Sequence, residues 1–69
     1  EIERVLTPRE QVVLTQIAAG KSNSEVAEAL HVTVETVKSQ VSSVLLKLGA
    51  RDRTQAVIRA FETGFIDPR

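Results

Sequence analysis

The segment from Ser22 to Gly49 carries two short helical patterns separated by only a few residues, and this arrangement most restricts the fold. In the second pattern, apolar residues recur at helical spacing, at Val37, Val41, Val44, Leu45 and Leu48. The opposite side is polar and short or cationic, with Glu35, Lys38, Ser39, Ser42 and Ser43. A helix with one apolar stripe and one slim polar face can enter the groove of a partner. We therefore expect residues 33–49 to be the working part of the chain.

Each expected helix begins with a side chain that can accept a hydrogen bond from the first helical turn. The pairs at this spacing are Thr7 with Glu10, Ser22 with Glu25, Thr33 with Thr36, and Asp52 with Gln55. A glycine follows three periodic segments, where a left-handed residue ends a helix: Gly20, Gly49 and Gly64. No strand pattern accompanies them. The sequence predicts an all-α fold, a four-helix bundle with helices at about 8–19, 23–30, 34–48 and 53–63.

The link between the second and third expected helices is only Leu30-His31-Val32-Thr33, so the third helix must leave at a steep angle. We expect Val32 to fill the space beneath this corner. The pattern is a helix-turn-helix, with 34–48 in the position of a recognition helix. Short turns of this kind also occur in helical bundles that bind other proteins. From the pattern alone, DNA binding and protein interaction both stay open.

Length and composition predict one small domain over residues 1–69. The chain has no cysteine, and no apolar run approaches the ~20 residues of a membrane span, so we expect a cytoplasmic protein without membrane segments. It begins at Glu1 without Met, which suggests part of a longer protein.

The net charge is zero, but residues 1–32 hold three basic and five acidic groups, and residues 33–69 hold six basic and four acidic groups. Positive potential is therefore expected around the third helix and beyond it.

Several blocks occur in an order that closely resembles the LuxR-type helix-turn-helix domain of NarL/FixJ response regulators and quorum-sensing regulators. The blocks are Leu6-Thr7-Pro8-Arg9-Glu10, Ala19-Gly20-Lys21-Ser22-Asn23-Ser24-Glu25-Val26-Ala27, Thr36-Val37-Lys38, Lys47-Leu48-Gly49 and Arg53-Thr54-Gln55-Ala56. The resemblance covers about residues 5–62. It implies a bacterial DNA-binding domain whose third helix lies in the major groove and whose fourth helix joins two copies.

The resemblance also implies roles for particular residues. Lys38, Ser39 and Ser42 match positions that face bases or nearby phosphates, and Lys47 matches one that lies toward the backbone. This chain has Gln40 where relatives often have His, Ser24 where they often have Lys, and Ser42 where many have Lys or Arg. Each change removes positive charge, so we expect a single copy to bind weakly. Arg53 matches a position that more often supports the structure.

The complete set of expected DNA contacts is Thr36, Lys38, Ser39, Gln40, Ser42, Lys47, Lys21 and Arg51. Several of these residues can also be explained without DNA contact. Lys38 can be an ordinary solvated lysine, the serines can be neutral surface residues, and Thr36 can be the partner of the Thr33 cap. Gln40 can reach a phosphate or merely pack against the helix. Leu46 points away from the apolar stripe, and an isolated exposed leucine needs no function.

The fourth expected helix has two apolar stripes. Ala56, Val57 and Ala60 can close the core, and a second ridge contains Thr54, Ile58 and Phe61. The resemblance implies that this ridge forms a homodimer. The alternative is that Ile58 or, more readily, Phe61 completes the core.

No catalytic or metal site is expected. His31 is the single histidine and has no second His, no Cys and no nearby carboxylate cluster, so it is interpreted as a turn residue. We expect no enzyme activity and no cofactor. The hypothesis is sequence-specific binding of double-stranded DNA by a bacterial transcription regulator, with a receiver or ligand-binding domain preceding this one in the intact protein. The alternative is a helical protein-interaction module.

Overall fold

The computed structural model describes residues 2–67 and contains five helices and no strand within that range. They are α1 (Ile2–Val5), α2 (Pro8–Ala18), α3 (Asn23–Leu30), α4 (Val34–Leu48) and α5 (Arg53–Glu62). The all-α prediction is confirmed, and α2 to α5 correspond to the four predicted helices. The short α1 was not predicted, because four residues are too few for a periodic pattern. It buries Ile2 against the core.

The predicted caps form as hydrogen-bonded pairs. At the start of α2, the Glu10 N–H donates to Thr7 Oγ1 at 3.1 Å, and the Thr7 N–H donates to Glu10 Oε1 at 2.9 Å. Ser22 and Glu25 make the same reciprocal pair at the start of α3. The Thr33 and Asp52 side chains accept from the backbone N–H three residues later. The helix starts are therefore fixed by local sequence.

Two helices have a left-handed residue as their C-cap. Gly49 ends α4 with φ of 66°, as predicted, and His31 ends α3 with φ of 59°. His31 is the one residue other than glycine with positive φ in the described chain. The turn residue between α3 and α4 thus adopts a conformation that usually favours glycine, which the sequence alone did not indicate.

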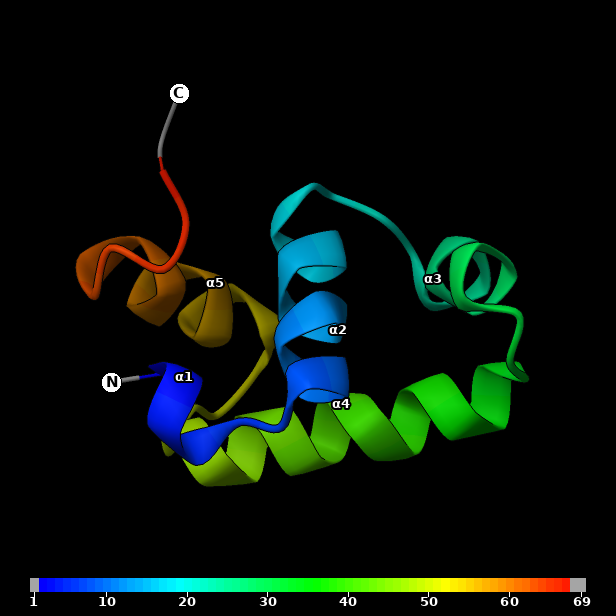
Figure 1. Cartoon of the computed structure of the whole chain (residues 1–69), viewed down its shortest axis with the longest axis horizontal. Helices are drawn as coiled ribbons and strands as arrows, with labels where there is room; N and C mark the ends of the chain where they lie inside the picture. Colours follow the sequence, from blue (N-terminus) through cyan, green and yellow to red (C-terminus); the bar gives the residue numbers. More distant parts are fainter. Residues whose placement is uncertain (1, 68–69) are drawn as a thin grey trace.

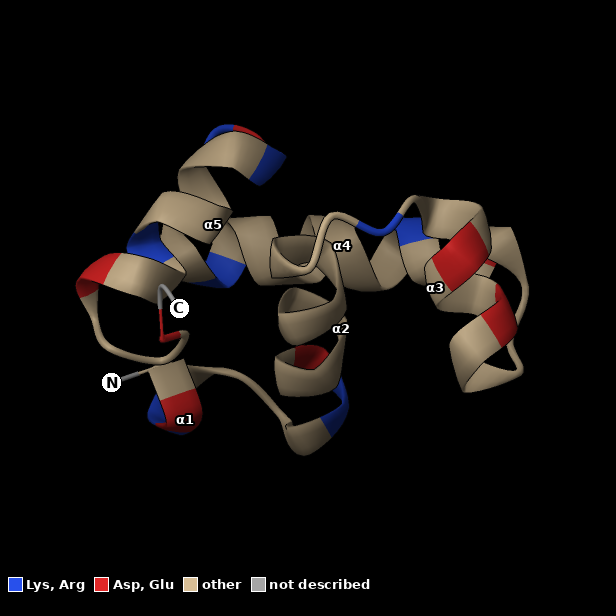
Figure 2. Cartoon of the chain, turned by 90° about the horizontal axis from the view of Figure 1, so that it is seen from above, with Lys and Arg blue, Asp and Glu red and all other residues tan. Residues whose placement is uncertain are grey.

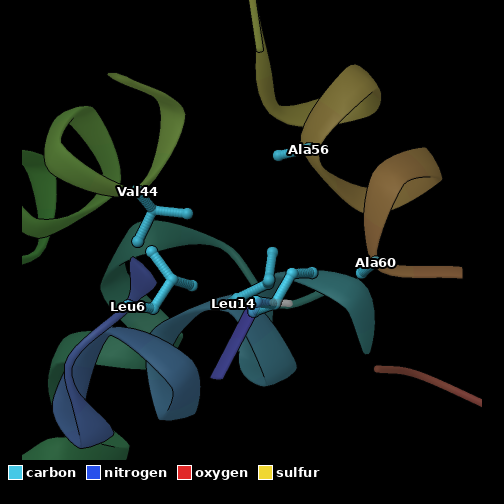
Figure 3. Packing of buried hydrophobic residues seen from close by; sticks show 6 residues of the cluster. Leu6, Leu14, Val44, Ala56 and Ala60 are labelled. Carbon is cyan, nitrogen blue, oxygen red and sulfur yellow. The ribbon is translucent and has the colours of Figure 1, made fainter. Parts of the chain in front are cut away.

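The helices surround α2, which crosses α4 and has α3 and α5 on opposite sides (Figure 1). One buried cluster joins α1, α2, α4 and α5, and Figure 3 shows its side chains converging on Leu14. The other cluster joins α2, α3 and α4 through Val13, Ile17, Val26, Ala27, Val37 and Val41. Ala56 and Ala60 are fully buried, and their small side chains allow α5 to pack closely. The core therefore holds the apolar stripe of α4 inward and leaves its other side facing solvent.

Candidate nucleic-acid interface

The outer side of α4 has a centre and two edges. At about 100° per residue, Ser39 and Leu46 lie near its centre, whereas Lys38 and Lys47 lie roughly half a turn apart on its two edges. Ser39, Ser42 and Leu46 are all exposed, and Leu46 is 82% exposed. The predicted slim polar face is therefore present, with one protruding leucine on it.

The Lys38 edge faces the start of α5. Lys38, Ser42, Arg51 and Arg53 are among the residues that line an open groove of about 620 Å³. The Lys38 ammonium is 3.6 Å from Glu35 Oε2, and both side chains are largely exposed, so this pair is weak and leaves Lys38 accessible. The structure thus brings Arg51 beside two of the predicted recognition residues, which no sequence spacing indicates.

The opposite edge of α4 faces the first turn of α2, and here one prediction was wrong. Ser43 was expected on the polar outer face, but it is half-buried and its hydroxyl donates to Glu10 Oε2 at 2.6 Å. Lys47 lies on the same edge, and its ammonium donates to Glu10 Oε1 at 2.8 Å. The reason is the crossing of α2 over α4, which places a buried carboxylate where the sequence suggests solvent.

Glu10 is consequently a strongly held anion. It is 8% exposed. The hydrogen bond from Lys47, then those from Ser43 and the Thr7 N–H, lower the pKa of Glu10 from the ordinary 4.5 to about 2, against the opposing effect of burial. Sequence reasoning assigned Glu10 only to the cap of α2.

Thr36 and Gln40 lie on this same edge of α4. Thr36 is exposed and its hydroxyl is 3.0 Å from that of Thr33, so it does take part in the cap. Gln40 is half-buried, and its Oε1 is buried without a hydrogen-bond partner within the described chain. A contact from Gln40 to DNA therefore requires its amide to move outward, and its packing role is the one observed.

The remaining predicted cations lie on loops. Figure 2 shows basic segments before α3 and at the start of α5, while α3 itself carries acidic residues. Lys21 is half-buried at the edge of a second groove, not beside Lys38. Arg53 donates to Lys21 O at 2.9 Å and to Asn23 Oδ1, and so ties α5 to the loop before α3. Arg53 has the structural position that the resemblance implied.

The predicted ridge on α5 is exposed. Thr54, Ile58 and Phe61 are all exposed, with Ile58 at 49% and Phe61 at 37%. The interpretation of Phe61 as a core residue is wrong, because Ala56 and Ala60 occupy the buried side of α5 and Phe65 packs partly against the same cluster. Ile58 and Phe61 instead border the second groove, of about 430 Å³.

Neither a metal centre nor a membrane span is found in residues 2–67. No group of three or more His, Cys, Asp or Glu residues could hold a metal ion in this part of the chain. None of its helices has the length and apolar character needed to cross a bilayer.

Residues 4–60 match the family described as "Bacterial regulatory proteins, luxR family". The chain belongs to the LuxR family. The match spans the helix-turn-helix, both α4 edges and most of α5. LuxR membership identifies a DNA-binding regulatory module and not an enzyme.

Curated LuxR relatives include the response regulator protein VraR of Staphylococcus aureus and its counterparts in Staphylococcus saprophyticus and Staphylococcus epidermidis. Each is 52% identical over 66 residues, which is 96% of this chain and 32% of the relative. The chain thus spans about a third of the length of these relatives.

Proposed function

We propose that the chain binds double-stranded DNA sequence-specifically, with α4 lying in the major groove. The observation that carries this proposal is the two-sided character of α4: its apolar stripe is buried against α2 and α3, and its outer side presents the short, exposed side chains of Ser39 and Ser42. In a helix-turn-helix, the N-terminal part of the recognition helix contacts base edges. Short hydroxyl side chains allow that part to approach the bases closely.

The charged residues on either side of this face are suited to phosphates. Lys38 and Arg51 share one groove, so they can approach the backbone of one strand, and Lys38 can also donate to guanine O6 and N7. Lys47 and Thr36 lie on the other edge of α4, toward the second strand. Lys21 and, after a rotation of its amide, Gln40 complete the proposed contacts. Positions near the N-terminus of α4 also gain from backbone N–H groups and the helix dipole.

The exposed ridge of Thr54, Ile58 and Phe61 is the proposed homodimer contact. Two copies joined through α5 would bind two half-sites about one turn of DNA apart. The relatives are called response regulators and are about three times as long as this chain, which supports a receiver or ligand-binding domain before residue 1 in the intact protein. The chain itself is then the single C-terminal DNA-binding domain of a cytoplasmic bacterial regulator.

A salt titration tests the proposal. If each copy neutralises about three phosphates, log K plotted against log salt has a slope of roughly −5 for a bound dimer. Lys38→Ala should weaken binding to a selected site by about 1–3 kcal/mol. DNA binding that ignores both salt and Lys38→Ala would refute the proposal.

A second function is supported by the apolar border of the α5 groove, where Ile58 and Phe61 are exposed. This surface could bind another protein instead of a second copy. Partner binding that persists at high salt, ignores Lys38→Ala and is lost in Ile58→Asp would favour a protein-interaction module.

A further inference from the structure

Glu10 is the one buried charged residue within the described chain, and it lies at the junction of α2 and α4. Its Oε1 accepts from Lys47 Nζ at 2.8 Å and from the Thr7 N–H at 2.9 Å. Its Oε2 accepts from Ser43 Oγ at 2.6 Å. A buried carboxylate with three donors is fixed in position, because moving it would leave both the charge and the donors without partners.

The two lysines of α4 therefore differ in their freedom. Lys38 is 3.6 Å from a glutamate whose side chain is 85% exposed, a pair that water and salt easily replace. The carboxylate beside Lys47 is only 10% exposed and cannot leave. A phosphate that approaches the Lys47 ammonium also approaches Glu10, so the phosphate meets a pair with almost no net charge.

We propose that Glu10 is a positioning residue for DNA binding: it fixes the Lys47 ammonium on the edge of α4 and cancels most of its contribution to phosphate attraction. This inference rests on the proposed DNA-binding function. Lys47 has two further N–H groups, so it can still donate a directed hydrogen bond to a phosphate. Lys47 therefore helps to position the chain on the DNA and adds little to non-specific affinity. Lys38 and Arg51 supply the electrostatic attraction that salt screens.

Three forms of the chain separate this role from simple structural support: wild type, Glu10→Gln, and the double variant Glu10→Gln with Lys47→Met. Glutamine keeps an oxygen for the Thr7 N–H and serves in capping boxes. The double variant has the same net charge as wild type, which makes it the matched control. Each form is titrated with a random-sequence DNA duplex between about 50 and 200 mM salt.

Release of Lys47 in Glu10→Gln should steepen the slope of log K against log salt by about 0.9 for each bound copy, since one more phosphate is neutralised. The double variant should return to the wild-type slope. Loss of stability alone would not steepen the slope. The inference is wrong if Glu10→Gln keeps the wild-type slope and the double variant is shallower by about 0.9, because Lys47 then already neutralises a phosphate in wild type. A wild-type chain whose weak binding ignores salt would instead refute the proposed function itself.

A measurement on the wild type covers the case in which Glu10→Gln does not fold. The side-chain ammonium signals of the lysines are followed by NMR at low temperature as the same duplex is added. Lys38 should shift strongly, whereas the hydrogen exchange of the Lys47 ammonium should be slow before DNA is added and stay slow afterwards. Rapid exchange of Lys47 in the free chain would overturn the inference, because the ammonium would not be held by Glu10.

Discussion

Replacing Glu10 by glutamine removes the buried charge between α2 and α4 while keeping most of the side-chain volume. The hydrogen bonds from Lys47, Ser43 and the Thr7 N–H lower the pKa of Glu10 from 4.5 to about 2 in the folded chain. A folded-state pKa below the unfolded one means that the ionised carboxylate stabilises the fold. This stabilisation is complete above about pH 4.5 and is lost as the pH falls toward 2.

The difference between these two pKa values corresponds to about 3 kcal/mol at neutral pH. The Lys47 side chain is 37% exposed, so solvent screening reduces the effect to about 2 kcal/mol. For a chain of this size, that loss lowers the melting temperature by on the order of 10 °C. Glu10→Gln should therefore be less stable than wild type at pH 7, and the two should converge near pH 2.

Urea unfolding followed by circular dichroism at several pH values between 7 and 2.5 measures this difference. Glu28→Gln is the control: it removes an exposed carboxylate from α3, and its effect should stay within about 0.5 kcal/mol. A difference between wild type and Glu10→Gln that stays constant with pH would refute the electrostatic argument. It would show that the substitution acts through packing instead of charge.

Three further outcomes are expected. Ile58→Asp should abolish DNA-stabilised dimers in ultracentrifugation while leaving the circular dichroism of the monomer unchanged; normal dimers would remove α5 from that role. Gly49→Ala should destabilise the fold by about 1 kcal/mol, since its left-handed φ of 66° is strained for alanine, whereas His31→Gly at φ of 59° should stabilise it by about 0.5 kcal/mol. Thermal unfolding measures both changes in stability. Changes of the same sign in Gly49→Ala and His31→Gly would contradict the role given to the left-handed backbone. Arg53→Met should speed amide hydrogen exchange in the loop before α3, because it removes the hydrogen bond to Lys21 O; unchanged exchange would show that the loop is held by other contacts.

Local features of the fold could be predicted from the sequence because their partners are three or four residues apart. The Thr7 cap, the apolar stripe of α4 and the left-handed Gly49 all depend on spacing along one helix. The exposed ridge on α5 follows from the same periodicity. Such features do not need the angle between helices.

The tertiary contacts of the site could not be predicted in this way. Glu10 meets Ser43 and Lys47 only because α2 crosses α4 at that point, and 33 and 37 residues separate them along the chain. The pattern therefore placed Ser43 on the outer face and gave Lys47 the same freedom as Lys38. Arg53 reaches Lys21 across 32 residues for the same reason. A polar residue at the edge of a helix faces solvent or another helix depending on the crossing angle, which spacing does not encode.

Under the proposed function, the outer side of α4 recognises a DNA sequence. This recognition is tested by selecting bound duplexes from a random pool and then measuring their affinities at one fixed salt concentration. We predict an enriched motif of two half-sites about one turn of DNA apart, bound roughly a thousandfold more tightly than a scrambled duplex. Lys38→Ala should reduce that preference. A pool that gains no common motif over repeated rounds, or a selected duplex bound no better than its scrambled form, would contradict the claim.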